Sequence, residues 1–198
     1  MSTALSAVAP KRQRGRLRVD AIMQAGAALF AEKGFDAATM TEIAARSGTA
    51  IGSLYRFFPT KETLADALIL RYGELLFAGL DEIIAGSAGL SSQQLADVLV
   101  DLMLRVREER SVAVALVDRQ DDASGRRTAL KVGTVERIAR ALRVQNDRLT
   151  EAQAEAMGAV LLHLLKSVPA FADGNEAVAE RMIAEVRKMA GAYIAAAV

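Results

Sequence analysis

A glycine turn opens the stretch "GTAIGSLYRFFPTKETL" (Gly48–Leu64), which decides the fold of the N-terminal region. The pattern predicts a short helix from Ala50 to Phe57, which the proline at position 59 ends before Thr60 starts the next helix. We expect Leu54 and Phe57 on the inner side of this helix. Its outer side then carries Ile51, Gly52, Tyr55 and Arg56.

The residues before this stretch predict two more helices. "TMTEIAARSG" begins with Thr39, three residues before Glu42, which is the spacing of a capping box at the start of a short helix. Apolar residues at helical spacing predict an earlier helix that ends at Gly34. Two short helices joined by a turn at Gly48 form a helix-turn-helix. The alternative is an ordinary helical hairpin with incidental surface residues.

The exposed edge of the later helix suits a DNA major groove. Gly52 and Ser53 permit close approach, and Tyr55 and Arg56 can donate hydrogen bonds to phosphate oxygens. Lys61 lies in the first turn of the following helix beside free backbone N–H groups, so we expect an anion site there.

Charge is distributed unevenly along the chain. Residues 1–61 hold nine Lys/Arg against four Asp/Glu, a net of +5, whereas residues 62–198 hold sixteen against twenty, a net of −4. Within "KRQRGRLR" we expect Arg14, Arg16 and Arg18 to contact nucleic acid from a flexible arm, although such runs are often only solvated tails.

Residues 18–64 resemble the N-terminal domain of the tetracycline-repressor (TetR/AcrR) family of bacterial transcriptional regulators. The resemblance rests on "FAEKGF", "TMTEIAARSG" and "IGSLYRFFPTKETL". It implies a homodimer that binds a palindromic operator and carries a helical effector domain behind the DNA-binding domain. Carried over by position, the phosphate contacts are Thr39, Thr41, Tyr55, Arg56 and Lys61, and the base-facing residues are Ile51, Gly52 and Ser53.

Two positions depart from the family pattern. Thr49 stands where valine is usual, and its hydroxyl is a candidate cap for the helix that follows. Phe57 stands where histidine or tyrosine is common, so that position lacks a phosphate donor.

Composition favours an all-α regulator over an enzyme. The chain has 198 residues, three prolines, no cysteine and one histidine, His163, which leaves no thiolate metal site and little for a catalytic triad. We therefore expect no metal, no cofactor and no catalytic residue. No charge-free apolar run approaches the ~18 residues of a membrane span, and the start of the chain does not resemble a signal peptide, so we expect a cytoplasmic protein.

The sequence predicts about nine helices and divides the chain into three parts. The three parts are a basic flexible arm (1–17), a helix-turn-helix domain (18–62) and an effector-binding and dimerisation domain (63–198). In the last part, capping boxes at Ser91 and Thr150 and a cap at Asn175 mark helix starts. Arg105 is interpreted as a surface pair with Asp101, four residues earlier.

An effector pocket is expected between the helices of the last part. Its predicted lining is aliphatic with few aromatic rings, which favours an apolar, aliphatic or nonplanar ligand over a flat cation. Arg105 or Asp118 could orient that ligand. The predicted lining residues are Ile69, Tyr72, Leu76, Leu102, Met103, Val106, Val112, Leu116, Val135 and Ile138.

The last two long helices are the predicted dimer interface. A stripe that includes Val160 is expected to face the core, while a row of small residues on another side allows a second helix to approach. The predicted interface residues are Ala152, Ala156, Ala159, His163, Met182, Val186, Met189 and Tyr193.

The sequence favours one of three function classes. The preferred one is a ligand-released repressor. An all-α enzyme would need a nucleophile with a base, a carboxylate pair or a phosphate-binding glycine loop, and the sequence shows no such set. A ligand-independent architectural DNA-binding protein would not need so large a C-terminal part.

Overall fold

The computed structural model describes residues 11–117, 125–172 and 175–196, and within them it contains helices and no strands. The predicted all-α class is therefore confirmed, and ten helical segments stand where about nine were expected. Their bounds are α1 (Lys11–Ala37), α2 (Met40–Arg46), α3 (Ile51–Phe57), α4 (Lys61–Gly86), α5 (Ser92–Arg105), α6 (Arg107–Val117), α7 (Arg126–Gln145), α8 (Glu151–Leu165), α9 (Val168–Ala172) and α10 (Glu176–Ala195).

The predicted helix starts follow from local hydrogen bonds. Capping boxes are present before α2, α5 and α8, with Thr39, Ser91 and Thr150 as the N-cap residues. In each, the N-cap hydroxyl accepts from the backbone N–H three residues later, and that residue's side chain accepts from the N-cap backbone. Asn175 is the N-cap of α10, but its side chain makes no capping hydrogen bond.

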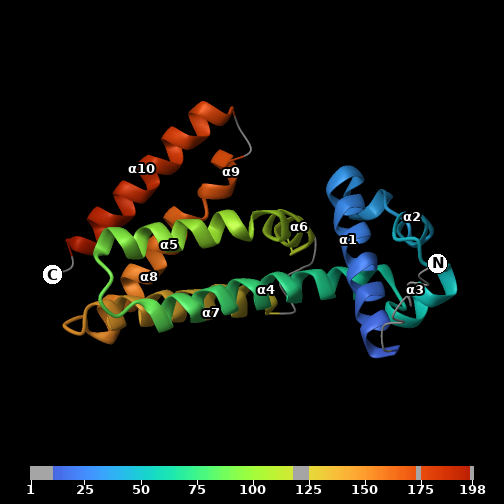
Figure 1. The fold of residues 1–198 in the computed structure, drawn as a ribbon, viewed down its shortest axis with the longest axis horizontal. Helices are drawn as coiled ribbons and strands as arrows, with labels where there is room; N and C mark the ends of the chain where they lie inside the picture. The colour runs from blue at the N-terminus through green and yellow to red at the C-terminus, as the bar shows by residue number, and fades with distance from the viewer. Residues whose placement is uncertain (1–10, 118–124, 173–174, 197–198) are drawn as a thin grey trace, which may run out of the picture. The chain divides into compact units, whose positions relative to one another are not determined.

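The chain divides into two compact units. The first runs to Leu70 and includes Val112–Leu116, and the second comprises Arg71–Ser111 and Val117–Val198. In the first unit, α1, α2 and α3 follow one another closely (Figure 1), and α1 packs on α2, which packs on α3.

A small core holds the first unit together. Ile22, Ile43, Leu54 and Leu64 are fully buried. A Cβ placed on Gly26 of α1 would lie 2.8 Å from Leu64 Cδ2 of α4, which is closer than Cβ contacts normally come. The absence of a side chain at position 26 therefore lets these two helices approach each other.

The flexible arm expected over residues 1–17 is wrong for residues 11–17, which form the first turns of α1. Gln13, Arg14 and Leu17 are good helix formers, and proline is absent from residues 11–33, so the helix continues through Gly15. The first ten residues of the expected arm lie outside the described residues. At the other end the prediction holds, because Gly34 adopts a φ of 78° and interrupts the helix.

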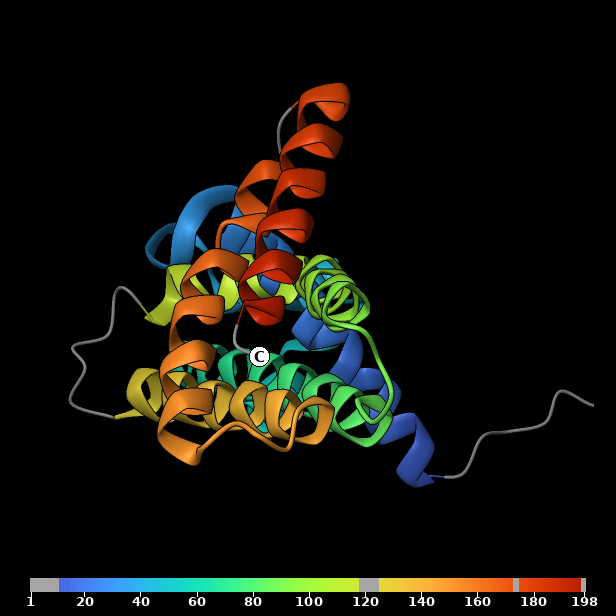
Figure 2. The same ribbon diagram turned by 90° about the vertical axis from the view of Figure 1, so that its left-hand side faces the viewer.

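The second unit is built from two main helix pairs. Helix α7 packs on α8, and α10 packs on α5, as the turned view in Figure 2 also shows. A Cβ on Gly158 would lie 3.0 Å from the carbonyl oxygen of Val135, so α7 and α8 come unusually close at this point. Leu99 of α5 and Leu161 of α8 are fully buried in the unit.

The expected pair between Asp101 and Arg105 is wrong. Asp101 Oδ1 lies 2.5 Å from Nη2 of Arg187 on α10, and Arg105 Nη2 lies 3.6 Å from Glu82 Oε2 on α4. A neighbouring helix therefore supplies each partner, which the (i, i+4) spacing alone does not indicate.

Among the described residues one stretch, Glu151–Ala172, is long and apolar enough to cross a membrane. The core helices of globular proteins meet the same condition, and α8, which makes up most of this stretch, packs against α7. Of the apolar window in this stretch, 44% is buried within the fold.

Candidate nucleic-acid interface

The turn between α2 and α3 is set by the backbone. Gly48 has a φ of 62°, and the N–H of Thr49 donates to the Ala44 carbonyl at 2.9 Å. The expected cap of α3 by Thr49 is wrong, because Ala50 is the N-cap and the Thr49 hydroxyl lies 3.5 Å from the Ser47 carbonyl oxygen. Thr49 is buried, so it fills the turn as valine would.

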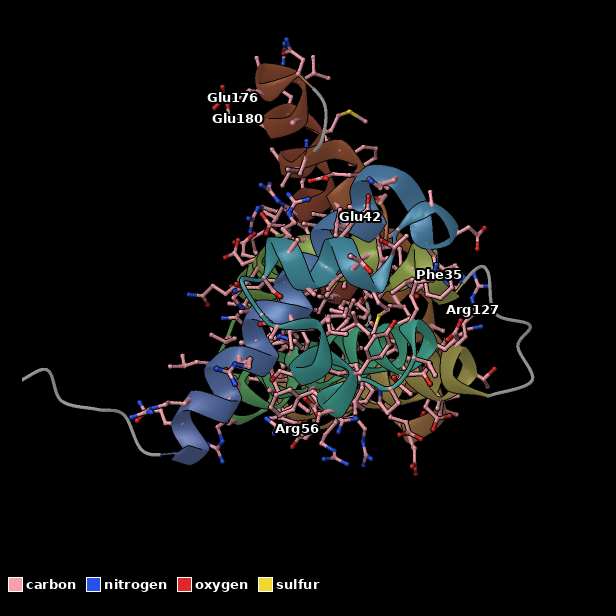
Figure 3. All side chains as sticks on the ribbon, turned by 90° about the vertical axis from the view of Figure 1, so that its right-hand side faces the viewer. Phe35, Glu42, Arg56, Arg127, Glu176 and Glu180 are labelled. Atoms are coloured by element: carbon pink, nitrogen blue, oxygen red, sulfur yellow. The ribbon has the colours of Figure 1, made fainter. Side chains whose placement is uncertain are left out.

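Helix α3 presents the exposed edge that its sequence predicts. Leu54 is fully buried, whereas Ile51 is 41% and Tyr55 48% exposed. Gly52 is also exposed, and Arg56 projects outward from the helix (Figure 3). This edge carries a methyl-rich side chain, a phenol and a guanidinium within two turns, a combination that can contact both base edges and phosphates.

Ser53 does not share this exposed edge. Its Oγ is buried and makes no hydrogen bond, and the residue as a whole is half-buried. The base contact expected of Ser53 stays a prediction, and it requires the Ser53 side chain to turn outward from this position.

The polar groups at the start of α2 form hydrogen bonds with one another and with α1. The Thr39 hydroxyl donates to Glu42 Oε2 at 3.0 Å and accepts from the Glu42 N–H, so its oxygen is engaged in the capping box. Lys33 Nζ lies 2.5 Å from Glu42 Oε1. The hydrogen bond from Lys33, followed by those from the Thr39 backbone and side chain, lowers the pKa of Glu42 to about 2. Thr41 is exposed one position into α2.

A second ion pair joins α1 to α2. Both Nη atoms of Arg46 lie 2.6 Å from the carboxylate oxygens of Glu32, a bidentate arrangement. The hydrogen bond from Arg46 lowers the pKa of Glu32, and the same bond raises the pKa of Arg46. Neither this pair nor the Lys33–Glu42 pair was predicted from the sequence, although both acceptors and donors stand in the quoted segments "FAEKGF" and "TMTEIAARSG".

Lys61 does not form the expected anion site. Its Nζ lies 2.6 Å, 3.1 Å and 2.9 Å from the carbonyl oxygens of Phe35, Asp36 and Ala38. An ammonium has three donors, so this geometry uses all of them within the unit. The expected phosphate contact by Lys61 is inconsistent with this arrangement.

The basic segment adds cations on a helix rather than on an extended chain. Arg14, Arg16 and Arg18 are exposed in the first turns of α1, and the first turn contains no acidic residue. Positions 14 and 18 are one turn apart on the same face, while position 16 lies on roughly the opposite face, at ~100° of rotation per residue.

The residues predicted to line an effector pocket are mostly buried, but they divide between the two units. Ile69, Leu116 and half-buried Val112 belong to the first unit. In the second unit, burial raises the pKa of Tyr72, which a hydrogen bond and the charge of Arg110 partly oppose. The other second-unit residues are buried or half-buried, namely Leu76, Leu102, Met103, Val106, Val135 and Ile138. Asp118 lies outside the described residues.

The predicted dimer face is largely exposed, with two corrections. Val186 is 4% exposed and belongs to the core of the second unit, whereas Val160, expected in the core, is 51% exposed. Nδ1 of exposed His163 lies 2.8 Å from the Ala159 carbonyl oxygen, so this nitrogen carries the donated proton. Helix α10 adds an apolar exposed row made of Val178, Met182, Met189 and Tyr193. On α8, Ala152 and Ala156 are exposed and Ala159 is half-buried.

Known proteins share both the helix-turn-helix sequence and the fold. Residues 22–68 match the family "Bacterial regulatory proteins, tetR family". The HTH-type transcriptional repressor KstR2 of Rhodococcus jostii (strain RHA1) is 34% identical over 95 residues, which cover 48% of this chain and 46% of the repressor. The chain thus spans about half the length of this curated relative.

Two solved structures share the fold over most of the chain. The SmeT–triclosan complex has a TM-score of 0.67 at 20% identity and covers 88% of this chain and 90% of that one. A putative TetR-family regulator from Mesorhizobium loti MAFF303099 has a TM-score of 0.68 at 22% identity and covers 92% and 96%. Residues 22–68 are therefore similar to the tetR family of bacterial regulatory proteins, and the chain shares its fold with these two solved structures.

Proposed function

We propose that the protein is a transcriptional repressor that binds a palindromic operator as a homodimer and is released by a small molecule. The observation that carries the proposal is the exposed edge of α3, with Ile51, Gly52, Tyr55 and Arg56 held outward by buried Leu54. A helix of this kind can enter a major groove, where Ile51 contacts a thymine methyl and Tyr55 and Arg56 hold phosphates.

The family match supports a regulator over the alternatives. Family members are described as regulatory proteins, and the KstR2 relative is named a repressor. The match therefore argues against the all-α enzyme, and a bacterial cytoplasm is the compartment in which we propose that the protein works.

The exposed faces of α8 and α10 support dimerisation. Met189 is 58% and Val178 47% exposed, and such side chains on one helix lose contact with water when a second copy covers them. Two copies would bring two α3 helices to half-sites about one DNA turn, ~34 Å, apart. Ala152 and Ala156 would allow the helices of the two copies to approach closely.

An apolar effector is proposed from the buried aliphatic residues of the second unit. The related fold in the SmeT structure holds triclosan, which shows that a protein with this fold accepts a small organic molecule. In this chain Leu102, Met103 and Val106 of the α5 region are buried candidates for the lining. Their side chains gain affinity from apolar area rather than from ring stacking.

The proposal is tested by a gel-shift assay on the DNA just upstream of the protein's own reading frame. We expect a nanomolar shift that unrelated competitor DNA does not remove. Equal shifts on all DNA would indicate the architectural protein, and no shift at any concentration would return the enzyme to consideration. The single variant Arg56→Gln should weaken binding similarly on all sequences, because a phosphate contact carries no base information.

A further inference from the structure

The Lys61 ammonium hydrogen-bonds to three backbone carbonyls within the first unit. It meets the carbonyl oxygens of Phe35, Asp36 and Ala38 at 2.6–3.1 Å, and it lies 4.5 Å from the centre of the Phe35 ring. The side chain is half-buried. A charged donor among three carbonyls and an aromatic face is a fixed arrangement rather than a solvated surface lysine.

The three carbonyls belong to the junction between α1 and α2. The helix path breaks at Gly34, where φ is 78°, and the chain then runs through Phe35 to Ala38 before Thr39 caps α2. Lys61 stands at the start of α4, more than twenty residues later in the sequence. It therefore ties the beginning of α4 to the segment that determines where α2 starts.

The position of α2 decides the position of α3. The two helices pack together, and the Thr49 N–H donates to the Ala44 carbonyl of α2 at 2.9 Å. A shift of the α1–α2 junction would thus be passed to the exposed edge of α3.

We propose that Lys61 is a positioning residue for DNA binding, which holds the recognition helix in place through the α1–α2 junction and does not itself bind phosphate. The inference rests on the proposed function. To reach a phosphate, the ammonium would have to give up hydrogen bonds with carbonyls that already occupy its three donors.

The salt dependence of operator affinity separates the two roles. Removing a phosphate contact lowers the slope of log affinity against log salt by ~0.9, or ~1.8 for a dimer, because fewer counterions are released. Removing a positioning residue lowers affinity without changing that slope. Lys61→Met keeps the aliphatic stem, and Arg56→Gln on the exposed edge of α3 is the matched control for a direct contact.

We expect Lys61→Met to weaken operator binding at least about tenfold at an unchanged salt slope, while Arg56→Gln flattens the slope. Lys61→Arg retains the charge, but a planar guanidinium cannot direct its donors at three carbonyls around one point. We expect this variant to lose affinity as well. A slope that falls for Lys61→Met as it does for Arg56→Gln, or wild-type affinity for Lys61→Arg, would overturn the inference.

Hydrogen exchange in the full-length protein without DNA provides a readout that is independent of operator binding. We expect the amides of residues 39–43 to exchange faster in Lys61→Met than in the wild type, while those of α8 are unchanged. Unchanged exchange at residues 39–43 would overturn the positioning role. Failure of the wild-type protein to bind any operator would instead refute the proposed function. The exchange result would still show whether Lys61 holds the start of α2 in place, because it is measured without DNA.

Discussion

The three arginines in the first turns of α1 lead to a prediction about the salt dependence of DNA binding. The expected change in salt slope depends on whether these turns are helical. Arg14, Arg16 and Arg18 are exposed, and positions 14 and 18 share a face that position 16 does not share. A helix can direct two of the three cations at one DNA strand, or four per dimer. An extended arm can direct all three, or six per dimer.

We therefore expect the triple change of Arg14, Arg16 and Arg18 to Gln to flatten the salt slope by ~3.6 rather than ~5.4, at ~0.9 per phosphate contact. Between 50 and 200 mM salt, a slope difference of ~3.6 corresponds to a factor of roughly 150 in relative affinity. Fluorescence anisotropy with a labelled operator at four or five salt concentrations measures the slope.

The matched control removes the same charge from the second unit. Arg140, Arg143 and Arg148 are exposed there, and changing them to Gln should leave the slope unchanged. Equal flattening by both triple variants would mean that only net charge matters. An unchanged slope for the α1 variant would mean that its cations are merely solvated, and a change near ~5.4 would refute the helical form in the complex.

Three further predictions concern the dimer, the α1–α2 contact and the effector. Ala159→Arg should weaken the dimer, because an unpaired charge buried at a close helix crossing costs several kcal/mol. Sedimentation measures the dimer, with Val132→Arg, a change at an exposed position of α7, as the control. An unchanged dimer in Ala159→Arg would place the interface elsewhere. Because the pKa of Glu42 is lowered to about 2, its carboxylate stabilises the fold above its unfolded pKa of ~4.3 and loses this effect as pH falls toward 2. The urea unfolding midpoint of Glu42→Gln should thus lie below that of the wild type at pH 7, and the two midpoints should converge near pH 2. A difference between the midpoints that does not change with pH would show that the ionised carboxylate is not what stabilises the wild type. In a thermal-shift screen with operator release as the readout, aliphatic amphiphiles should release the protein, and release by planar cations alone would refute the aliphatic pocket.

The sequence is sufficient to predict the features that depend on residues close together in the chain. The capping boxes at Thr39, Ser91 and Thr150 depend on residues three apart, and the break at Gly34 depends on one residue's backbone freedom. The exposed edge of α3 follows from the helical period once Leu54 is assigned to the core. Short-range rules therefore predict the helix-turn-helix and its outer face.

The sequence is insufficient to predict contacts between side chains and partners far away in the chain. Lys61 finds three carbonyls more than twenty residues earlier, and Asp101 pairs with Arg187 of α10 instead of its neighbour Arg105. Val160 and Val186 lie on helices with apolar residues on two sides, so periodicity alone could not indicate which side faces the core. Each of these outcomes depends on how distant helices pack, which spacing and periodicity along the chain do not reveal.

The central claim is that two copies of α3 read a two-part DNA site. Selection of bound duplexes from a random DNA library by the purified full-length protein tests it most directly. We predict a recovered consensus of two inverted half-sites whose centres lie about one DNA turn, ~34 Å, apart. Recovered sequences with no common site, or with a single half-site that binds as tightly as a pair, would contradict the account.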